Sequence, residues 1–555
     1  MAVVAVLSAL VELHILDKGG FFLDDFRNIG AARAGLSLRL LFTPIGGYRL
    51  QPVNRFLEWL TAAPLHTSYA AAVVVYVVIH GFGTYWLIRL LDAVWGPRGF
   101  HLLVGFLFGT SLVLIAASQW VATAATSTVA VDFAAGACLG FVCWLSTGRW
   151  WTYALGLVAT ALAVCSWETA LVVPATITMI WACFARGRQP VRRALLAQVP
   201  FYVVALAFLV YVELQPWHEA LILPTLGAWL ELLLEMAGRE LPSSLVGTGA
   251  PGGALDSFQL FSVVVPLVVL GVAAGWLVGR RRFEWLAPVV FVVTTVLVSI
   301  PIAATRDYLG AGVAATTPRY VTFLPLLFAI SVAGAVRPRP NEREGRPDHP
   351  PPWHTIAVTV AALAFCGAYL FNLMHHSFNA NEFGIQSGRA GMAEADRVGA
   401  GIAALGRAGE RSLIDSTVPY PIYYPTNDGT SELGDGLLPY WSTTARTFGE
   451  GRIAGVDLTT GVVRWASFHD DAGGTQLKYV RVVVRASAAT TMVVRIAASQ
   501  PTQPEVPWRI SMPAGAHSVT LAAWATTVRS VSVRGPHLIL LSVRPGTVTL
   551  GAPVA

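Results

Sequence analysis

The sequence predicts a mainly α-helical bundle that crosses a membrane about 11 times and is followed by a soluble β-sandwich domain. The chain is 55% hydrophobic and only 13% charged, with a mean hydropathy of +0.59, which is more apolar than a water-soluble core requires. Apolar runs of roughly 20 residues, enough to cross about 30 Å of hydrocarbon, recur over the first two thirds. From residue 451 onward the pattern changes to short β-rich runs.

The apolar runs predict the individual spans within a membrane domain of residues 1–372. The first run contains Glu12 and His14 and lacks a basic start and a small-residue cleavage pattern, so we expect a retained helix and not a signal peptide. The predicted spans are 2–16, 68–91, 100–118, 120–145, 151–166, 168–184, 194–214, 258–279, 285–304, 319–336 and 353–372.

The basic residues predict the orientation of these spans. With a cytoplasmic amino terminus, five sets of arginines all fall on the cytoplasmic side, as the positive-inside rule favours. The loops 17–67, 213–257 and 305–318 and everything after 373 are then outside a multi-pass cell membrane protein. The basic residues are Arg89, Arg98, Arg149, Arg186, Arg188, Arg192, Arg193, Arg280, Arg281, Arg282, Arg337, Arg339, Arg343 and Arg346.

The charge distribution bears on the binding partners, and the cysteine positions bear on disulfides and metal sites. The net charge of +6 is not grouped with stacking aromatic residues on one soluble domain, so we expect membrane lipids and not nucleic acid as partners. All five cysteines lie in predicted spans, which argues against a disulfide framework or a thiolate metal site. They are Cys138, Cys143, Cys165, Cys183 and Cys366.

The remaining segments connect or follow the spans. The stretch 337–352 is rich in proline and charge, which predicts a cytoplasmic linker. Residues 373–450 are an exported connecting region, with short helices expected in 381–410 and an aromatic, proline-rich loop in 412–450. Residues 451–555 contain runs such as 479–485, 492–496 and 537–543, which predict an antiparallel sandwich, and carbohydrate binding is one role open to it.

The chemistry-bearing feature of the sequence is an acidic pair just after the first span. Asp24 and Asp25 stand in Phe-Phe-Leu-Asp-Asp-Phe-Arg-Asn, next to aromatic residues suited to the membrane interface. Transfer of a sugar from a lipid phosphate to a hydroxyl needs a base for the acceptor proton and positive charge for the leaving phosphate. One carboxylate could be that base, and a single inverting displacement needs no second one.

The two aspartates need not share a role, because neighbours on a helix point about 100° apart. Asp25 is also a candidate ligand for a divalent cation such as Mg²⁺, Mn²⁺ or Ca²⁺. The plain alternative is that both residues cap a juxtamembrane helix that contains Ile29, Ala32 and Arg33.

Further segments carry a family resemblance. After the acidic pair come Gly47-Tyr-Arg-Leu-Gln-Pro-Val-Asn-Arg, a histidine in the second span at position 80, Ser166-Trp-Glu-Thr-Ala-Leu-Val-Val-Pro and Thr317-Pro-Arg-Tyr. In this order, over about residues 1–335, they resemble the GT-C superfamily of membrane glycosyltransferases that use polyprenyl-phosphate sugars. The chain departs from that pattern at Trp167, where the superfamily has lysine before the glutamate.

The resemblance implies a role for each matching residue. Asp24 or Asp25 would be the catalytic base, Arg319 and Arg306 would bind the donor phosphate, and Glu168 would hold the outer pocket. The substrate-binding candidates are Tyr48, Arg49, His80, Glu168, Arg306, Arg319 and Tyr320. Arginine suits phosphate because its fork makes two charge-assisted contacts.

Each of these roles has a plain structural alternative. Arg306 and Arg319 could snorkel to the interface, Glu168 could cap its helix or pair with an arginine, and Tyr48 and Arg49 could pack the loop. His80 fits a buried, hydrogen-bonded histidine better than a catalytic one.

The predicted function is therefore inverting transfer of a sugar from a polyprenyl-phosphate donor to an exported glycan, lipid or protein. Arabinofuranose, mannose and glucose are all open as the donor sugar. A transporter or lipid flippase is the first alternative, favoured by Asp132 within the fourth predicted span. A non-catalytic membrane anchor that displays a carbohydrate-binding domain is the second.

Overall fold

The structure is a computed structural model, and its chain divides into two compact units. The first comprises Met1–Gly19, Leu36–Leu60 and Ser68–Gln386, and the second comprises Gly20–Gly35, Thr61–Thr67 and Ser387–Ala555. The residues that the structure describes are 1–21, 25, 28, 32, 35–42, 49–66, 68–215, 225–237, 241, 286–306, 318–335, 364–374, 411–414, 447–449, 453–457, 462–465, 476–498, 508–524, 528–534 and 536–549.

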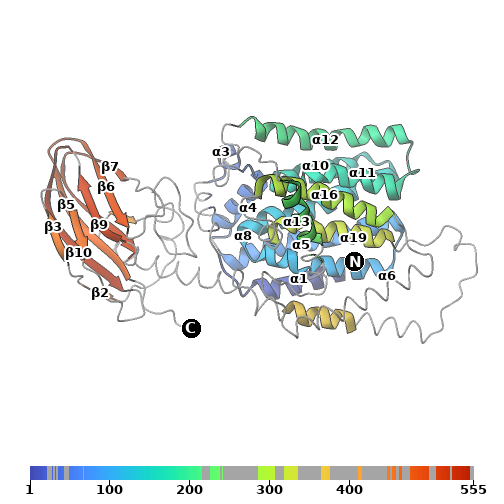
Figure 1. Ribbon diagram of the computed structural model, residues 1–555, viewed down its shortest axis with the longest axis horizontal. Helices are drawn as coiled ribbons and strands as arrows, with labels where there is room; N and C mark the ends of the chain where they lie inside the picture. The colour runs from blue at the N-terminus through green and yellow to red at the C-terminus, as the bar shows by residue number, and fades with distance from the viewer. Residues whose placement is uncertain are drawn as a thin grey trace, which may run out of the picture. The chain divides into compact units, whose positions relative to one another are not determined.

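The first unit is a bundle of helices that lie side by side (Figure 1). Most of its elements are α-helices, whereas η2 is a 3-10 helix and η1 and η3 are π-helices. All the labelled elements of this bundle follow in chain order. They are α1 (Ala2–Leu16), α3 (Leu38–Leu41), α4 (Pro52–Ala62), α5 (Tyr69–Trp95), α6 (Gly99–Gly109), α7 (Leu112–Ser118), α8 (Val121–Thr123), η1 (Ala124–Thr128), α9 (Val129–Thr147), α10 (Trp150–Ser166), η2 (Glu168–Val172), α11 (Val173–Ile180), η3 (Trp181–Ala185), α12 (Val191–Glu213), α13 (Leu226–Glu235), α16 (Leu286–Arg306), α18 (Pro318–Val321) and α19 (Phe323–Ala335).

Six of the described helices are long and apolar enough to cross a membrane. They are Tyr69–Trp95, Gly99–Ser118, Val121–Thr147, Glu168–Ala185, Val191–Glu213 and Leu286–Ala303. Shorter apolar helices occupy Ala2–Leu16, Trp150–Ser166, Arg319–Ala335 and Ala364–Met374. These boundaries follow the predicted spans closely, whereas the predicted span 258–279 lies outside the described residues, so the number eleven stays a prediction.

The predicted span 100–118 is interrupted at Thr110 and Ser111, where α6 ends and α7 begins. A break in a helix leaves backbone carbonyls without their usual partners. The carbonyl of Thr110 accepts a hydrogen bond from the Tyr369 hydroxyl at 2.6 Å, from helix Ala364–Met374. The break therefore gives a distant helix a polar attachment point inside the bundle.

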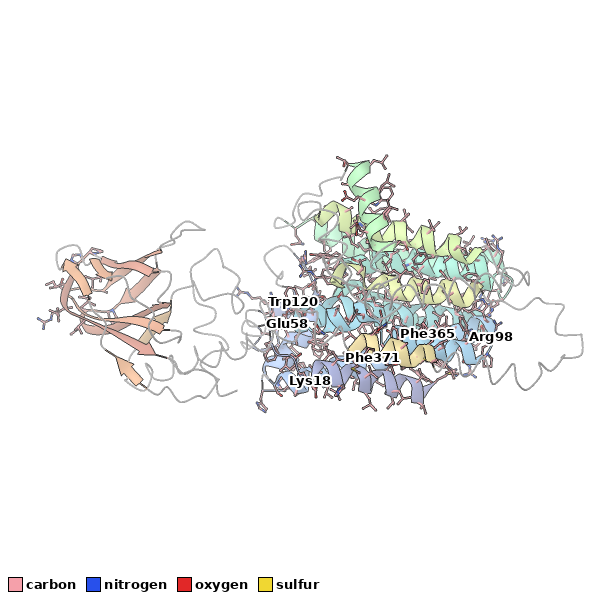
Figure 2. The ribbon with its side chains drawn as sticks, turned by 60° about the horizontal axis from the view of Figure 1, so that its bottom comes forward. Lys18, Glu58, Arg98, Trp120, Phe365 and Phe371 are labelled. Carbon is pink, nitrogen blue, oxygen red and sulfur yellow. The ribbon has the colours of Figure 1, made fainter. Side chains whose placement is uncertain are left out.

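The bundle has two chemically distinct ends. Figure 2 shows Lys18, Glu58 and Trp120 at one end and Arg98 at the other. At the Arg98 end, Arg188 donates to the carbonyls of Ala93 and Val94 at 2.8 and 2.7 Å, so its guanidinium satisfies the last carbonyls of α5. The ends alternate along the chain as the predicted topology requires, although the side that faces the cytoplasm stays a prediction.

Small residues allow α9 and α10 to approach closely. A methyl group added at Gly140 would lie 2.7 Å from the Cα of Gly156 and 2.8 Å from the Thr152 carbonyl oxygen. These neighbours are backbone atoms, which cannot move aside without separating the two helices. Close backbone approach at small residues is a common way to pack helices in membranes.

We expect Gly140→Ala to destabilise the bundle by about 1–3 kcal/mol, because overpacking forces the backbone apart. The measurement is the unfolding midpoint of the purified full-length protein in mixed detergent micelles. The matched control is Gly99→Ala, where an added methyl group meets nothing within 4 Å. Equal midpoints for the two variants would contradict the close approach of α9 and α10.

The second unit contains two five-stranded sheets, with orders β1-β8-β5-β10-β2 and β3-β4-β9-β6-β7. β1 pairs with β8 in parallel, and the other pairs are antiparallel. Their bounds are β1 (Arg411–Ile414), β2 (Thr447–Gly449), β3 (Ile453–Asp457), β4 (Val462–Trp465), β5 (Gln476–Ala486), β6 (Thr490–Ala498), β7 (Trp508–Met512), β8 (Gly515–Trp524), β9 (Val528–Arg534) and β10 (Leu538–Thr549).

The end of β5 shows the alternation expected of a strand with one buried face. Val484 and Ala486 are buried, whereas Arg485 between them is exposed. Packing of the two sheets into a sandwich, and any carbohydrate binding by it, stay predictions. The predicted linker 337–352, the expected helices in 381–410 and most of the aromatic segment 412–450 lie outside the described residues, and the domain boundaries at 372 and 450 stay predictions with them.

Three described helices fall inside loops for which no such helix was predicted from the sequence. α3 and α4 lie in the first predicted exported loop, and α13 lies in the loop 213–257. All three are too short to cross a membrane, which explains why a search for membrane spans misses them. α4 matters for function because it begins directly after Arg49 and Gln51.

Candidate functional site

A group of charged and aromatic side chains gathers where several elements begin. Gln51 precedes α4, Trp120 precedes α8, Glu168 opens η2 and Arg319 lies in α18. These elements begin at the bundle end where Figure 2 places Trp120. Side chains at their first residues can therefore project from that end. We call Arg49, Gln51, Trp120, Trp167, Glu168, Arg319 and Tyr320 the end cluster.

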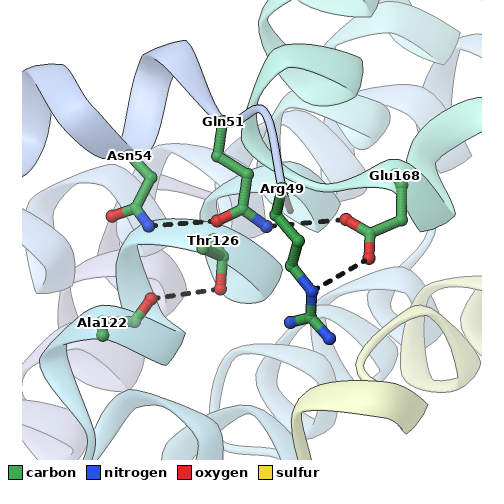
Figure 3. Close-up of polar contacts among 6 residues, drawn as sticks. All are labelled: Arg49, Gln51, Asn54, Ala122, Thr126 and Glu168. Atoms are coloured by element: carbon green, nitrogen blue, oxygen red, sulfur yellow. Dashed lines mark hydrogen bonds and ion pairs between the residues drawn. The ribbon is translucent and has the colours of Figure 1, made fainter. Parts of the chain in front are cut away.

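Glu168 holds the first loop to η2 (Figure 3). One of its carboxylate oxygens, Oε1, lies 3.9 Å from Nε of Arg49, and the other, Oε2, accepts a hydrogen bond from Nε2 of Gln51 at 3.5 Å. Gln51 in turn accepts from Asn54 in α4 at 3.2 Å. Figure 3 shows the two terminal nitrogens of Arg49 turned away from Glu168. The ion pair therefore uses Nε of Arg49 and not its terminal nitrogens.

Aromatic rings connect Arg49 to Arg319. The guanidinium carbon of Arg49 lies 5.3 Å from the centre of the Trp167 ring, and that ring stacks on Tyr320 with centres 6.4 Å apart. Arg319 lies over both Tyr320 and Trp120, at 4.9 and 5.0 Å. Cations within about 6 Å of an aromatic face are attracted to it, so the rings fix both guanidinium groups.

Two donors in the end cluster are buried without a partner. Trp167 is 3% exposed, and its indole Nε1 has no hydrogen-bond partner among the described residues. The same holds for Nε of Arg319. Buried donors are nearly always satisfied in native proteins, by protein, water or ligand. The cluster thus offers fixed positive charge and unused N–H groups, which together suit an anion.

The adjoining helix α4 carries an ion pair of its own. Nη1 of Arg55 lies 3.0 Å from Oε2 of Glu58, and the two side chains are only 6% and 1% exposed. A buried pair of this kind costs desolvation and is strongly destabilising when one partner is removed. This pair was not predicted, because Arg55 only ends the segment that begins at Gly47 and Glu58 lies outside every segment singled out in the sequence.

The structure brings together four of the predicted substrate-binding residues: Arg49, Glu168, Arg319 and Tyr320. Trp120 was not predicted as a site residue, and Trp167 was predicted only as a departure from a family pattern. The predicted topology places positions 49, 120, 167 and 319 at the same ends of the spans, and their side chains do lie together in the structure. The contacts between the arginines and the tryptophan rings were not predicted, because no motif joins them.

The other predicted site residues lie elsewhere or are not described. Asp25 is buried, at 1% exposure, whereas Asp24 and Tyr48 lie outside the described residues. Arg306 is the last residue of α16, and its side chain is likewise not described. His80 is 1% exposed and its Nδ1 lies 2.8 Å from Oδ1 of Asp132, so its contacts are those of a buried histidine in the bundle.

Among the described residues, no group of three or more His, Cys, Asp or Glu side chains is placed to hold a metal ion. A divalent cation at Asp25 stays a prediction.

No family model matches the chain, and no curated protein gives a significant match. Solved structures similar to it include the crystal structure of ArnT from Cupriavidus metallidurans bound to undecaprenyl phosphate, at 14% identity, with 73% of this chain and 72% of that chain covered and a TM-score of 0.35. Another is the cryo-EM structure of arabinosyltransferase EmbB from Mycobacterium smegmatis, at 10% identity, with 99% of this chain and 64% of that chain covered and a TM-score of 0.29. Because both TM-scores lie below 0.5, the function is inferred from this chain's own residues.

Proposed function

We propose that the protein is a membrane glycosyltransferase that transfers a sugar from a polyprenyl-phosphate donor to an exported acceptor. The observation that carries the proposal is the end cluster, in which aromatic rings hold Arg49 and Arg319 at one end of an apolar helical bundle. A lipid-linked phosphate combines a long apolar tail with an anionic head. An apolar bundle with fixed cations at its end is complementary to both parts.

The proposed reaction is a single displacement. The acceptor hydroxyl loses its proton to Asp24 or Asp25, and its oxygen bonds to the anomeric carbon as the bond from that carbon to the donor phosphate breaks. The configuration inverts because the attacking and leaving oxygens lie on opposite faces. Arg319, Arg49 and the Trp167 indole N–H would stabilise the negative charge that develops on the departing polyprenyl phosphate.

The remaining predicted residues have supporting roles in this proposal. Glu168 positions Arg49 by engaging its Nε, so that the terminal nitrogens stay directed elsewhere. Tyr48 precedes Arg49 in the sequence, and Arg306 is the last residue of α16. Both are proposed to contact the donor. The strands of the second unit are proposed to bind the acceptor, which is a glycan, lipid or protein, or to brace the first loop.

The decisive experiment supplies the purified full-length protein, in lipid nanodiscs, with synthetic polyprenyl-phosphate sugars and envelope glycan or lipid acceptors. We expect release of polyprenyl phosphate together with a glycosylated product when donor and acceptor match. The buried Asp132, at 0% exposure, is the observation that favours a lipid transporter. Movement of the lipid across proteoliposomes without any covalent transfer would support that alternative and overturn the enzyme.

Trp167 provides a test of the proposed donor site. We expect Trp167→Leu to raise the KM for the donor by about 2- to 30-fold, because it removes one cation–π contact worth about 0.5–2 kcal/mol. Trp167→Phe keeps a ring and should lie closer to wild type. The control is Trp150→Leu, since Trp150 is 77% exposed at the start of α10. An unchanged KM in Trp167→Leu would remove Trp167 from the donor site.

A further inference from the structure

Three ionisable side chains from three different helices meet inside the bundle. Glu12 of α1, His80 of α5 and Asp132 of α9 are 0%, 1% and 0% exposed. His80 and Asp132 each lie near the middle of a helix of 27 residues that is long enough to cross a membrane. Ionisable groups at that depth are costly and are generally kept for a purpose.

The three side chains interact electrostatically with one another. Nδ1 of His80 lies 2.8 Å from Oδ1 of Asp132, and Glu12 interacts electrostatically with both residues. Among the described residues, Oδ2 of Asp132 lacks a hydrogen-bond partner, and the polar neighbour of the Glu12 carboxylate is the Ser118 hydroxyl. Of the described charged groups, His80 is the cation that interacts with both carboxylates.

Glycines make room for these three side chains and the polar groups near them. A methyl group at Gly83 would overlap the carboxylate of Asp132, and one at Gly109 would lie 2.6 Å from Oγ1 of Thr84 and 2.8 Å from Oγ of Ser8. The two hydroxyls are buried and lack partners among the described residues. The helices thus enclose a compact polar centre inside the bundle.

Charge balance limits the protonation states of this centre. Two ionised carboxylates and one imidazolium would leave a net charge of −1 in a low-dielectric interior, where an uncompensated charge costs several kcal/mol. An imidazolium on His80, an ionised Asp132 and a protonated Glu12 give zero net charge. A protonated Glu12 also gains an O–H group that can donate a hydrogen bond, which the ionised form lacks.

We propose that Glu12, His80 and Asp132 form an intramembrane proton-binding site in which Glu12 is the neutral carboxylic acid. The ligand of this site is the proton that Glu12 carries, and the paired His80 and Asp132 hold it by hydrogen bonding. Because α1 reaches the bundle centre through Glu12, the site also anchors this helix, which leads into the acidic segment of the first loop. The proposal does not depend on the transferase activity.

Infrared spectroscopy of the full-length protein in lipid nanodiscs tests the proton directly. We expect wild type to show the carbonyl stretch of a protonated carboxylic acid and Glu12→Gln to lose it. Asp17→Asn is the matched control, because Asp17 is exposed at the end of the same helix, and it should keep the band. Absence of the band in wild type, or its survival in Glu12→Gln, would overturn the proposal.

Thermal unfolding distinguishes a bound proton from a bound metal cation. Glutamine resembles a neutral carboxylic acid in shape, so Glu12→Gln should unfold close to wild type, whereas Asp132→Asn should unfold at a lower temperature because it breaks the pair with His80. Wild-type unfolding should not depend on the sodium or potassium concentration at constant ionic strength. A large loss in Glu12→Gln together with cation-dependent unfolding would show an ionised Glu12 and overturn the proposal.

Discussion

Asp24→Asn or Asp25→Asn is expected to lower kcat/KM for transfer by about 10²–10⁴, the usual contribution of a general base. Asparagine keeps the size and hydrogen-bonding capacity of the side chain but cannot accept the acceptor's proton. The effect should fall mainly on kcat, because the base acts in the transition state and contributes little to donor binding. A loss confined to one variant identifies the base.

The measurement is initial-rate transfer in membranes that contain equal amounts of each variant, with lipid-linked sugar supplied as donor. Asp17→Asn is the control, since Asp17 is an exposed carboxylate at the end of α1, a few residues before the acidic pair. If both single variants and the double variant transfer at the wild-type rate, the base lies elsewhere. Activity of Asp17→Asn should match wild type.

The burial of Asp25 bears on this expectation. At 1% exposure, its side chain is removed from water. A surface cap, the plain alternative, would normally leave the carboxylate in solvent contact. Burial therefore fits a base better than a cap, while the choice between Asp24 and Asp25 still rests on the two variants.

The long apolar helices could be predicted from the sequence because one property, continuous hydrophobicity, determines them. α5 and α12 fall within a few residues of the predicted spans 68–91 and 194–214. The break at Thr110 could not be predicted, because it depends on the Tyr369 hydroxyl, which comes from a helix more than 250 residues later. α4 was missed because its polar residues are buried by the fold and carry no apolar signal of their own.

The candidate site shows the same division. Arg49, Glu168 and Arg319 were selected from short motifs, each of low specificity, and the structure places them in one cluster. The rings that connect them, Trp120 and Trp167, had no motif to mark them. His80 and Asp132 were considered separately in the sequence, as a substrate contact and as a sign of transport, and only the fold shows that they are partners.

Arg319→Gln is expected to lower kcat/KM by about 10²–10³, comparable with the loss of one group that stabilises developing negative charge. Arg319 is held over Trp120 and Tyr320, so its charge is already in place before the donor phosphate leaves. Arg319→Lys keeps the charge but loses the planar fork and much of the ring contact. Its kcat/KM should therefore fall between those of Arg319→Gln and wild type. We expect a reduction of about tenfold from wild type, which corresponds to roughly 1.4 kcal/mol.

A structural role for Arg319 predicts a different pattern, because snorkelling to the interface requires only a long basic side chain. Lysine would then restore full activity, and inhibition by the product polyprenyl phosphate would be the same in all variants. If Arg319 binds phosphate, the glutamine variant should need a higher concentration of polyprenyl phosphate for half-inhibition, and neutral polyprenol should inhibit neither protein through this site. Arg149→Gln, at an exposed arginine before α10, controls for the loss of one surface charge. Unchanged inhibition in Arg319→Gln would place the phosphate away from the end cluster and leave Arg319 as an interface anchor.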